Sequence, residues 1–317
     1  MSEIQAPPFC VQIEPTEGCP LMCKFCGIHG IRQKAGDYKF MSVELAKDIA
    51  KQMAKLGWNS RVEFAMHGEP SVNPKLFDIV AAFREELPKA YLLLETNGSG
   101  LLDNPVGFTW DMKSAGLNCL AVDEYAGCSW AKDFFDELES NGMKYYDYPK
   151  DKEGNPHQRK TGFCVTRVRP ITAGLGGTHA TLNNHCGCGA PLDFSMAGKR
   201  CAKPFREMSI RWDGGISICC NDWRGIIKAG SAQEGLDQVW NGPVFQASRR
   251  ILLEGKRDKI KICHGCNASS YRPGLLPDLK GQVELSDSTQ SDYDMLARVA
   301  WARTMAPTIT RPWEVKP

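Results

Sequence analysis

The stretch FCVQIEPTEGCPLMCKFC, residues 9–26, joins a strand-like segment to a tight group of cysteines. Residues 9–15 have the apolar character of a short buried strand. Cys19, Cys23 and Cys26 follow with the spacing C-x3-C-x2-C. Three thiolates can hold three irons of a [4Fe–4S] cluster and leave the fourth iron open, because full protein ligation needs four. The alternative is a structural zinc ion with His29 as the fourth ligand.

Five more strand-like segments follow, and helical patterns separate most of them. The strands are expected at residues 61–66, 91–95, 118–122, 144–148 and 163–168. The helices are expected at residues 42–56, 74–87, 109–115 and 129–140, with Ser42 capping the first and Asn73 and Pro74 opening the second. This alternation favours an α/β fold with a parallel sheet or an incomplete βα barrel, in which functional sites lie at the C-terminal ends of the strands.

The pattern changes after residue 170. Residues 171–200 are loop-like, and MSIRWDGGISICC, residues 208–220, predicts a β-hairpin that turns at Asp213-Gly214-Gly215. Residues 231–254 predict one or two helices interrupted at Gly242-Pro243, and residues 291–304 predict another.

Composition narrows the class of protein. The 317 residues include 14 cysteines, and no segment has the pattern of a secretion signal or a membrane span. We therefore expect a cytoplasmic protein, in the host cytoplasm if it is phage-encoded, whose thiols are metal ligands or reactive groups rather than disulfides. The net charge of +2 provides no basic surface for extended nucleic-acid binding.

The loop CPLMCKFC, with Phe25 directly before Cys26, resembles the signature of radical S-adenosylmethionine (radical SAM) enzymes. The resemblance implies a partial (β/α)6 TIM-type barrel, a catalytic [4Fe–4S] cluster held by Cys19, Cys23 and Cys26, and S-adenosylmethionine on the open iron. Such enzymes cleave S-adenosylmethionine reductively and abstract a substrate hydrogen atom with the 5′-deoxyadenosyl radical. An external reductant such as flavodoxin or ferredoxin is implied as a partner.

Further residues match motifs of the same family. His67-Gly68-Glu69-Pro70 is similar to its GGEP motif, which binds the amino group of S-adenosylmethionine, with His67 in place of the first glycine. His67 is expected either at the cofactor or as a core histidine. Asn97, in Thr96-Asn97-Gly98, and Asp123 lie where the family contacts the same cofactor. Arg167 and Arg169, at the end of the sixth strand, are expected to face a carboxylate or phosphate at the barrel mouth.

A second group of cysteines lies in the C-terminal third. Their order resembles the twitch form of the SPASM domain, a β-hairpin plus helix that binds one auxiliary [4Fe–4S] cluster. The resemblance implies Cys201, Cys219, Cys263 and Cys266 as ligands, with Cys220 as the alternative to Cys219. A closed cluster of this kind accepts or relays an electron or braces the domain, and a structural zinc ion is the alternative.

Two cysteines outside both groups, Cys186 and Cys188, lie in the loop LNNHCGCGAP, residues 182–191. Loops at this place approach the active site in related enzymes. The two thiols are expected either to be inert or to contact substrate and supply a hydrogen atom.

These motifs divide the chain into a barrel, residues 1–198, a twitch domain, residues 199–272, and an extension, residues 273–317. The expected activity is oxidation or rearrangement of a small-molecule, nucleotide or peptide substrate. Open alternatives are a phage-type isomerase of an amino-acid-modified thymidine in DNA hypermodification, a peptide maturase, and a non-enzymatic zinc or electron-transfer protein.

Overall fold

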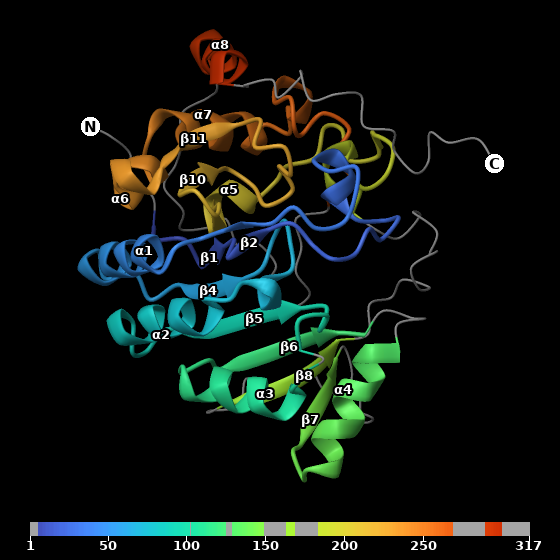
Figure 1. Ribbon diagram of the computed structural model, residues 1–317. Coiled ribbons are helices and arrows are strands. Elements are labelled where there is room, and N and C mark those ends of the chain that lie inside the picture. The colour runs from blue at the N-terminus through green and yellow to red at the C-terminus, as the bar shows by residue number, and fades with distance from the viewer. Residues whose placement is uncertain are drawn as a thin grey trace, which may run out of the picture.

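The computed structural model describes residues 6–101, 103–124, 129–148, 163–168, 183–268 and 289–299. Their main feature is one nine-stranded sheet with the order β11-β10-β9-β1-β4-β5-β6-β8-β7 (Figure 1). A small second sheet pairs β2 (Thr16–Glu17) with β3 (Lys39–Phe40). Arg169 lies outside the described residues. No helix among the described residues is long and apolar enough to cross a bilayer.

The six predicted strands are all present and lie in parallel in the large sheet. They are β1 (Cys10–Ile13), β4 (Arg61–Phe64), β5 (Leu92–Thr96), β6 (Cys119–Asp123), β7 (Tyr145–Tyr148) and β8 (Cys164–Val168). The order of the strands in the sheet differs from their order in the sequence at one place, because β8 lies between β6 and β7. The first three residues of β8 are buried, whereas Tyr145 and Tyr146 of β7 are half-buried, so β7 suits the edge.

The helices between these strands are α1 (Val43–Lys55), α2 (Leu76–Glu86), α3 (Pro105–Ser114) and α4 (Ser129–Ser140). Ser42 caps α1 as predicted, because its Oγ accepts a hydrogen bond from Leu45 N at 3.1 Å. The predicted start of α2 is wrong by two residues. Asn73 Oδ1 accepts from Lys75 N at 2.8 Å, and Asn73 Nδ2 donates to Pro15 O at 2.7 Å, so Asn73 holds the preceding turn instead.

The hairpin after residue 200 continues the same sheet. It consists of β9 (Glu207–Ile210) and β10 (Gly215–Ser217), and β11 (Lys228–Ser231) adds a third strand that was not predicted. β9 pairs in parallel with β1, from Cys10 opposite Glu207 to Ile13 opposite Ile210. The barrel and the hairpin therefore share hydrogen-bonded strands.

Helices and short turns complete the C-terminal part. They are α5 (Lys203–Arg206), α6 (Leu236–Trp240), α7 (Pro243–Leu253), α8 (Gln290–Val299), η4 (His185–Gly187), η5 (Ala232–Glu234) and η6 (Arg257–Lys259). The predicted break at Gly242-Pro243 is confirmed, because α7 begins at Pro243. In Figure 1, α8 lies beyond α7 at one end of the molecule, and β7 and α4 lie at the other.

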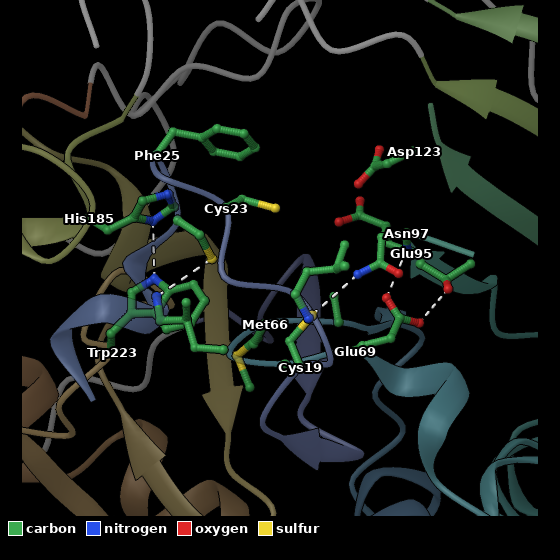
Figure 2. Close-up of a pocket in the computed structure, with 16 residues that line it drawn as sticks. Cys19, Cys23, Phe25, Met66, Glu69, Glu95, Asn97, Asp123, His185 and Trp223 are labelled. Atoms are coloured by element: carbon green, nitrogen blue, oxygen red, sulfur yellow. Dashed lines mark hydrogen bonds between the residues drawn. The ribbon is translucent and has the colours of Figure 1, made fainter. Parts of the chain in front are cut away.

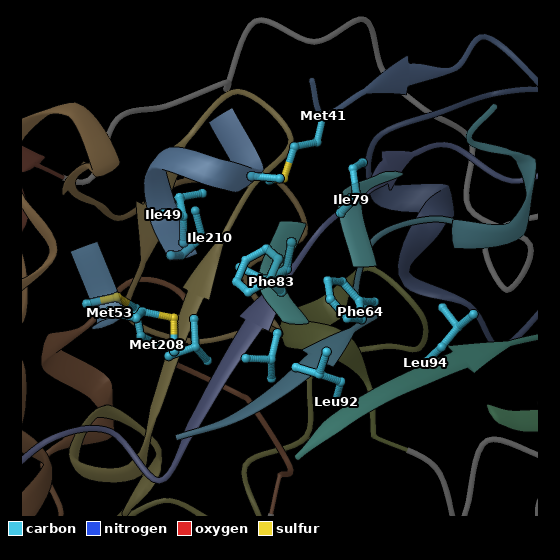
Figure 3. Packing of buried hydrophobic residues seen from close by; sticks show 14 of the residues in the cluster. Met41, Ile49, Met53, Phe64, Ile79, Phe83, Leu92, Leu94, Met208 and Ile210 are labelled. Atoms are coloured by element: carbon cyan, nitrogen blue, oxygen red, sulfur yellow. The ribbon is translucent and has the colours of Figure 1, made fainter. Parts of the chain in front are cut away.

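The core joins the two parts of the chain. Ile49 and Met53 of α1 gather with Phe83 of α2 near Met208 and Ile210 of β9 (Figure 3). Phe64 of β4 meets Phe83 edge to face, with ring centroids 5.3 Å apart. Because the same helices cover β4 and β9, the hairpin is packed as part of the main core.

Candidate functional site

A cavity of about 290 Å³ lies at the C-terminal ends of β1, β4, β5 and β6. It brings together most of the residues predicted for the first site: Cys19, Cys23, Phe25, Cys26, Gly68, Glu69, Asn97 and Asp123. In Figure 2, Glu69, Glu95, Asn97 and Asp123 lie on one side of this cavity and His185 and Trp223 on the other.

The loop that follows β1 presents its thiols among hydrogen-bond donors. Cys19 Sγ accepts from Leu21 N at 3.4 Å and from Asn97 Nδ2 at 3.3 Å. Cys26 Sγ accepts from Ile28 N at 3.5 Å, at the start of η1 (Gly27–Gly30). Burial raises the pKa of both thiols to about 12. Amide donors of this kind compensate negative charge on sulfur, which suits thiolates that ligate iron.

His29 does not join these thiols, which corrects the zinc alternative that used it. Its side chain is absent from the cavity lining, and its Nε2 lies 3.0 Å from the carbonyl oxygen of Cys23. The imidazole therefore stabilises the cysteine loop through a backbone contact.

Glu69 occupies the centre of the polar side. Its Oε1 accepts hydrogen bonds from the amide and hydroxyl of Ser71, at 2.9 and 2.6 Å, and from the hydroxyl of Thr96. Its Oε2 accepts from Asn97 N at 2.7 Å. Burial raises the pKa of Glu69, and these donors oppose that shift. Oε2, with one donor, has room for another from the cavity.

Gly68 fixes this motif against the cysteine loop. Gly18 and Gly68 form a parallel bridge, in which Gly18 N donates to His67 O at 3.3 Å and Glu69 N donates to Gly18 O at 2.9 Å. A Cβ on Gly68 would lie 2.3 Å from Thr16 O and 2.5 Å from Gly18 O. Close backbone approach therefore requires glycine here, and Pro70 then opens η2 (Pro70–Val72).

The structure differs from the predicted cofactor contact of His67. The side chain is fully buried and does not line the cavity. Nδ1 lies 2.5 Å from Glu14 Oε1, and Nε2 donates to the carbonyl oxygen of Cys220 at 2.7 Å. Since both ring nitrogens are engaged, His67 acts as the core histidine of the two alternatives and ties β4 to the hairpin.

Arg167 also lies away from the cavity. Its Nε is 3.7 Å from Glu124 Oε2, and its guanidinium lies over the rings of Tyr145 and Phe135 at 4.8 and 5.3 Å. The predicted position facing an anion at the barrel mouth is wrong, because aromatic packing against β7 and α4 directs the side chain elsewhere.

Sequence reasoning missed several residues that line the cavity, among them Met66, Glu95, His185 and Trp223. Trp223 Nε1 donates to His185 Nδ1 at 3.0 Å, and burial lowers the pKa of His185 to about 4, so the imidazole is neutral at pH 7. Trp223 covers Gly27 so closely that a Cβ there would meet the indole at 2.3 Å. In the sequence, Trp223 is marked only by its position four residues after Cys219.

The other cysteines line a second, much smaller cavity of about 20 Å³, which we call the closed cavity. It is lined by the thiol-bearing residues Cys186, Cys201, Cys219, Cys263 and Cys266. Cys220 is not in the lining, and Lys203 Nζ donates to its sulfur at 3.5 Å. The structure therefore places Cys219, rather than Cys220, with the other three predicted ligands, and adds Cys186.

The charges around this cavity suit an anionic group. Arg257 is buried and donates to the carbonyl oxygens of Lys199, Arg200, Cys266 and Ala268 at 2.9 to 3.3 Å. No ion pair of Arg257 with a carboxylate occurs among the described residues. Asn221 N donates to Cys219 Sγ at 3.4 Å. A cluster held by four thiolates is anionic, so an uncompensated guanidinium and an amide donor to sulfur fit it.

The cysteines of the second cavity differ in the direction of their pKa shifts. Burial raises the pKa of Cys201 and Cys263, and a hydrogen bond with Cys220 raises that of Cys219. A hydrogen bond with Cys186 lowers the pKa of Cys266 to about 7. Within the described residues, no three His, Cys, Asp or Glu side chains converge on one point as a single metal ion requires.

Fold and geometry thus define an α/β protein with two thiol-lined sites, one open to a small-molecule cavity and one closed. Comparison with protein families agrees with this class. The model of the radical SAM superfamily matches residues 13–107, and the model of the SPASM iron–sulfur cluster-binding domain matches residues 201–267. The chain therefore carries a radical SAM domain followed by a SPASM-like domain. The two domains imply a catalytic [4Fe–4S] cluster, an auxiliary cluster and S-adenosylmethionine.

Two curated relatives agree with the family. The S-adenosyl-L-methionine-dependent 2-deoxy-scyllo-inosamine dehydrogenase of Niallia circulans is 23% identical over 269 residues, 83% of this chain and 94% of the relative. The GTP 3′,8-cyclase of Mycolicibacterium smegmatis is 34% identical over 113 residues, 35% of this chain and 30% of the relative.

Solved structures share the fold. BtrN in complex with AdoMet and 2-DOIA superposes with a TM-score of 0.64 at 22% identity, covering 84% of this chain and 95% of that one. The anSMEcpe structure with bound AdoMet has a TM-score of 0.51 at 13% identity and covers 94% of both chains.

Proposed function

We propose that this chain is a radical SAM oxidoreductase that dehydrogenates a small polar molecule and passes one electron to its auxiliary cluster. The main support is the short loop after β10, which connects the two cavities: Cys219 lines the closed thiol cavity, and Trp223 lines the open one. The relation to a dehydrogenase over most of both chains supports the oxidative direction.

When bound, the catalytic cluster and S-adenosylmethionine supply a 5′-deoxyadenosyl radical, and the auxiliary cluster supplies an acceptor for one electron. Cys19, Cys23 and Cys26 would hold the first cluster, and Cys201, Cys219, Cys263 and Cys266 the second. In this proposal the substrate loses a hydrogen atom, then one electron and one proton, which together make a two-electron oxidation.

The polar side of the open cavity would bind S-adenosylmethionine. Glu69 Oε2 would accept from its amino group, because within the described part of the chain that oxygen accepts one hydrogen bond, from Asn97 N, and keeps a lone pair for another. Phe25, Asn97 and Asp123 line the same space and would complete the contacts. Trp223 and His185, opposite them, would exclude water from the reacting centre.

We also propose a division into a barrel (residues 1–198), a twitch domain (199–272) and an extension (273–317). The C-terminal family match begins at residue 201 and ends at 267, which supports the middle segment.

The test is anaerobic reconstitution followed by incubation with dithionite and S-adenosylmethionine. The protein should hold about eight irons and form 5′-deoxyadenosine. 2-Deoxy-scyllo-inosamine, the compound in the name of the dehydrogenase relative, is the first probe in a panel of amino sugars and aminocyclitols. A product two hydrogen atoms lighter than its substrate supports the proposal. Formation of 5′-deoxyadenosine with products of unchanged mass would instead support an isomerase, including the thymidine isomerase, and absence of cleavage would contradict the enzyme proposal.

A further inference from the structure

The closed cavity holds more thiols than a cluster needs. Four cysteines from residues 201–266 satisfy a [4Fe–4S] cluster, yet Cys186, from the preceding loop, lines the same cavity. Cys186 lies beside Cys266 in this lining, close enough for a hydrogen bond between the two thiols. Cys186 therefore contacts the site through one particular predicted ligand.

The backbone around Cys186 is strained. His185 and Cys186 have φ values of 47° and 53°, in the left-handed region that residues other than glycine seldom occupy. Two consecutive residues of this kind persist only where surrounding contacts hold them. Gly187 completes η4 directly after them.

Asparagine contacts hold this conformation and fasten the loop to the segment that carries Cys266. Asn184 N donates to Asn267 Oδ1 at 2.8 Å, and Asn184 Nδ2 donates to Gly265 O at 2.7 Å. These two partners flank Cys266 on either side. The position of Cys186 opposite Cys266 is therefore set by the hydrogen bonds of Asn184 and does not depend on the thiol contact alone.

We infer that Cys186 is a positioning residue of the auxiliary site rather than an iron ligand, and that its S–H donates to the sulfur of Cys266. This inference rests on the proposed auxiliary cluster. Hydrogen bonds to ligating sulfur stabilise the more negative, reduced state of a cluster and so raise its reduction potential. A raised potential favours acceptance of an electron from a substrate radical, which is the role proposed for this cluster.

The other side of the loop faces the open cavity. His185 accepts from Trp223, while its neighbour Cys186 faces the closed cavity. Cys188, two residues on, is buried against Ile28 and Trp223 beside the first cysteine loop. Cys188 therefore provides a matched control: a thiol of the same loop that faces the other site.

The experiment measures the auxiliary cluster alone, in the full-length triple variant Cys19→Ala, Cys23→Ala, Cys26→Ala. In this background, Cys186→Ala, Cys186→Ser and Cys188→Ala are reconstituted anaerobically and compared with the parent by iron content and by redox titration followed with electron paramagnetic resonance. Cys186→Ala should keep about four irons. At a fixed potential its oxidised-to-reduced ratio should rise roughly tenfold, which is 59 mV for one electron. Cys186→Ser, which keeps a donor, and Cys188→Ala should stay near the parent.

Two results would overturn the inference. Loss of iron in Cys186→Ala, with retention in Cys266→Ala, would make Cys186 a ligand instead of a donor. An unchanged potential in Cys186→Ala would show that the thiol contact does not act on the cluster. The proposed function is tested by a different measurement. A wild-type protein that binds both clusters but oxidises no substrate would contradict the proposed dehydrogenase activity, and the comparison of reduction potentials would still be valid.

Discussion

The two thiol sites differ in what surrounds the sulfur atoms. The first site opens into a cavity of about 290 Å³ whose lining includes Glu69, Asn97 and Asp123, whereas the second encloses about 20 Å³ beside Arg257. The first therefore leaves space for a small molecule, and the second is closed by protein. This difference agrees with the proposed roles, in which the first site activates S-adenosylmethionine and the second accepts an electron.

Strand pairing and buried hydrogen bonds nevertheless connect the two sites. β9 pairs with β1, and Arg211 Nη2, just beyond β9, donates to Glu17 Oε2 at 2.7 Å, just before Cys19. His67 bridges Glu14 and the carbonyl oxygen of Cys220. Variants can therefore show which properties belong to one site and which to the shared frame.

The largest expected effect separates the sites by cysteine replacement. Cys23→Ala should lose about four of eight irons and lower 5′-deoxyadenosine formation by at least about 1000-fold, because the open iron lies in that cluster. Cys201→Ala should also lose about four irons but still cleave S-adenosylmethionine, while substrate oxidation stops. Iron analysis and chromatography of the nucleoside products measure both. Equal loss of cleavage in the two variants would contradict the division of labour.

The next effect tests how the first site is held in place. Gly68→Ala puts a Cβ against Thr16 O and Gly18 O and should cost about 2–4 kcal/mol of unfolding free energy. Iron should be lost from the first site before the second, since the bridge from Gly68 to Gly18 supports only the cysteine loop. Denaturation and iron content measure these effects.

Gly215→Ala is the matched control for that variant, because the nearest atom to its Cβ is the flexible Asp213 side chain at 3.0 Å. A Gly68→Ala protein as stable and as iron-rich as this control would show that the close approach is unimportant.

The sequence predicted the parts of the first site that depend on local pattern. The cysteine spacing, the Gly68-Glu69 motif and the strand before each could be recognised because each is a short segment with its own periodicity or turn chemistry. All these segments end at one edge of a parallel sheet, so their convergence also followed from the topology.

The remaining features depend on tertiary packing. Lys228–Ser231, which forms β11, has no β-branched or aromatic residue and becomes a strand only by pairing with β10. Arg167 turns toward Tyr145 because β8 lies beside β7, an order that periodicity does not predict. Cys186 joins the second site only because Asn184 holds its loop beside Cys266, a contact between segments that lie far apart in the sequence.

A smaller effect concerns the shared frame. Burial opposes ionisation of Glu17, but Lys39 and Arg211 outweigh it and lower its pKa to about 2. A lowered pKa in the folded state contributes stability that is present above the unfolded value, about 4.3, and is lost as the pH falls toward 2. Glu17→Gln should therefore cost about 2–3 kcal/mol at pH 7.

Urea denaturation of the cluster-free chain measures this cost. The difference between wild type and Glu17→Gln should be constant from pH 7 to about 5 and shrink below about 4.3, where the wild-type carboxylate begins to lose its advantage. A difference that grew on acidification would have the wrong sign for a carboxylate stabilised by its partners.

The smallest expected effect concerns an ion pair outside both sites, which should change stability without changing either site. Arg250 of α7 donates to Asp292 of α8 from Nε at 2.9 Å and from Nη2 at 2.6 Å, and these hydrogen bonds lower the pKa of Asp292. Asp292→Asn should cost about 1–2 kcal/mol at pH 7, and the difference should fade as the pH drops below about 3.9, because the Asp292 carboxyl then protonates in the unfolded chain before it does in the folded protein. Iron content and S-adenosylmethionine cleavage should be unchanged, since α8 contacts neither thiol cavity through this pair. If Asp292→Asn lost iron from the second site, the helix that carries Arg250 would have to be counted as part of the frame that holds Cys201 and Cys263.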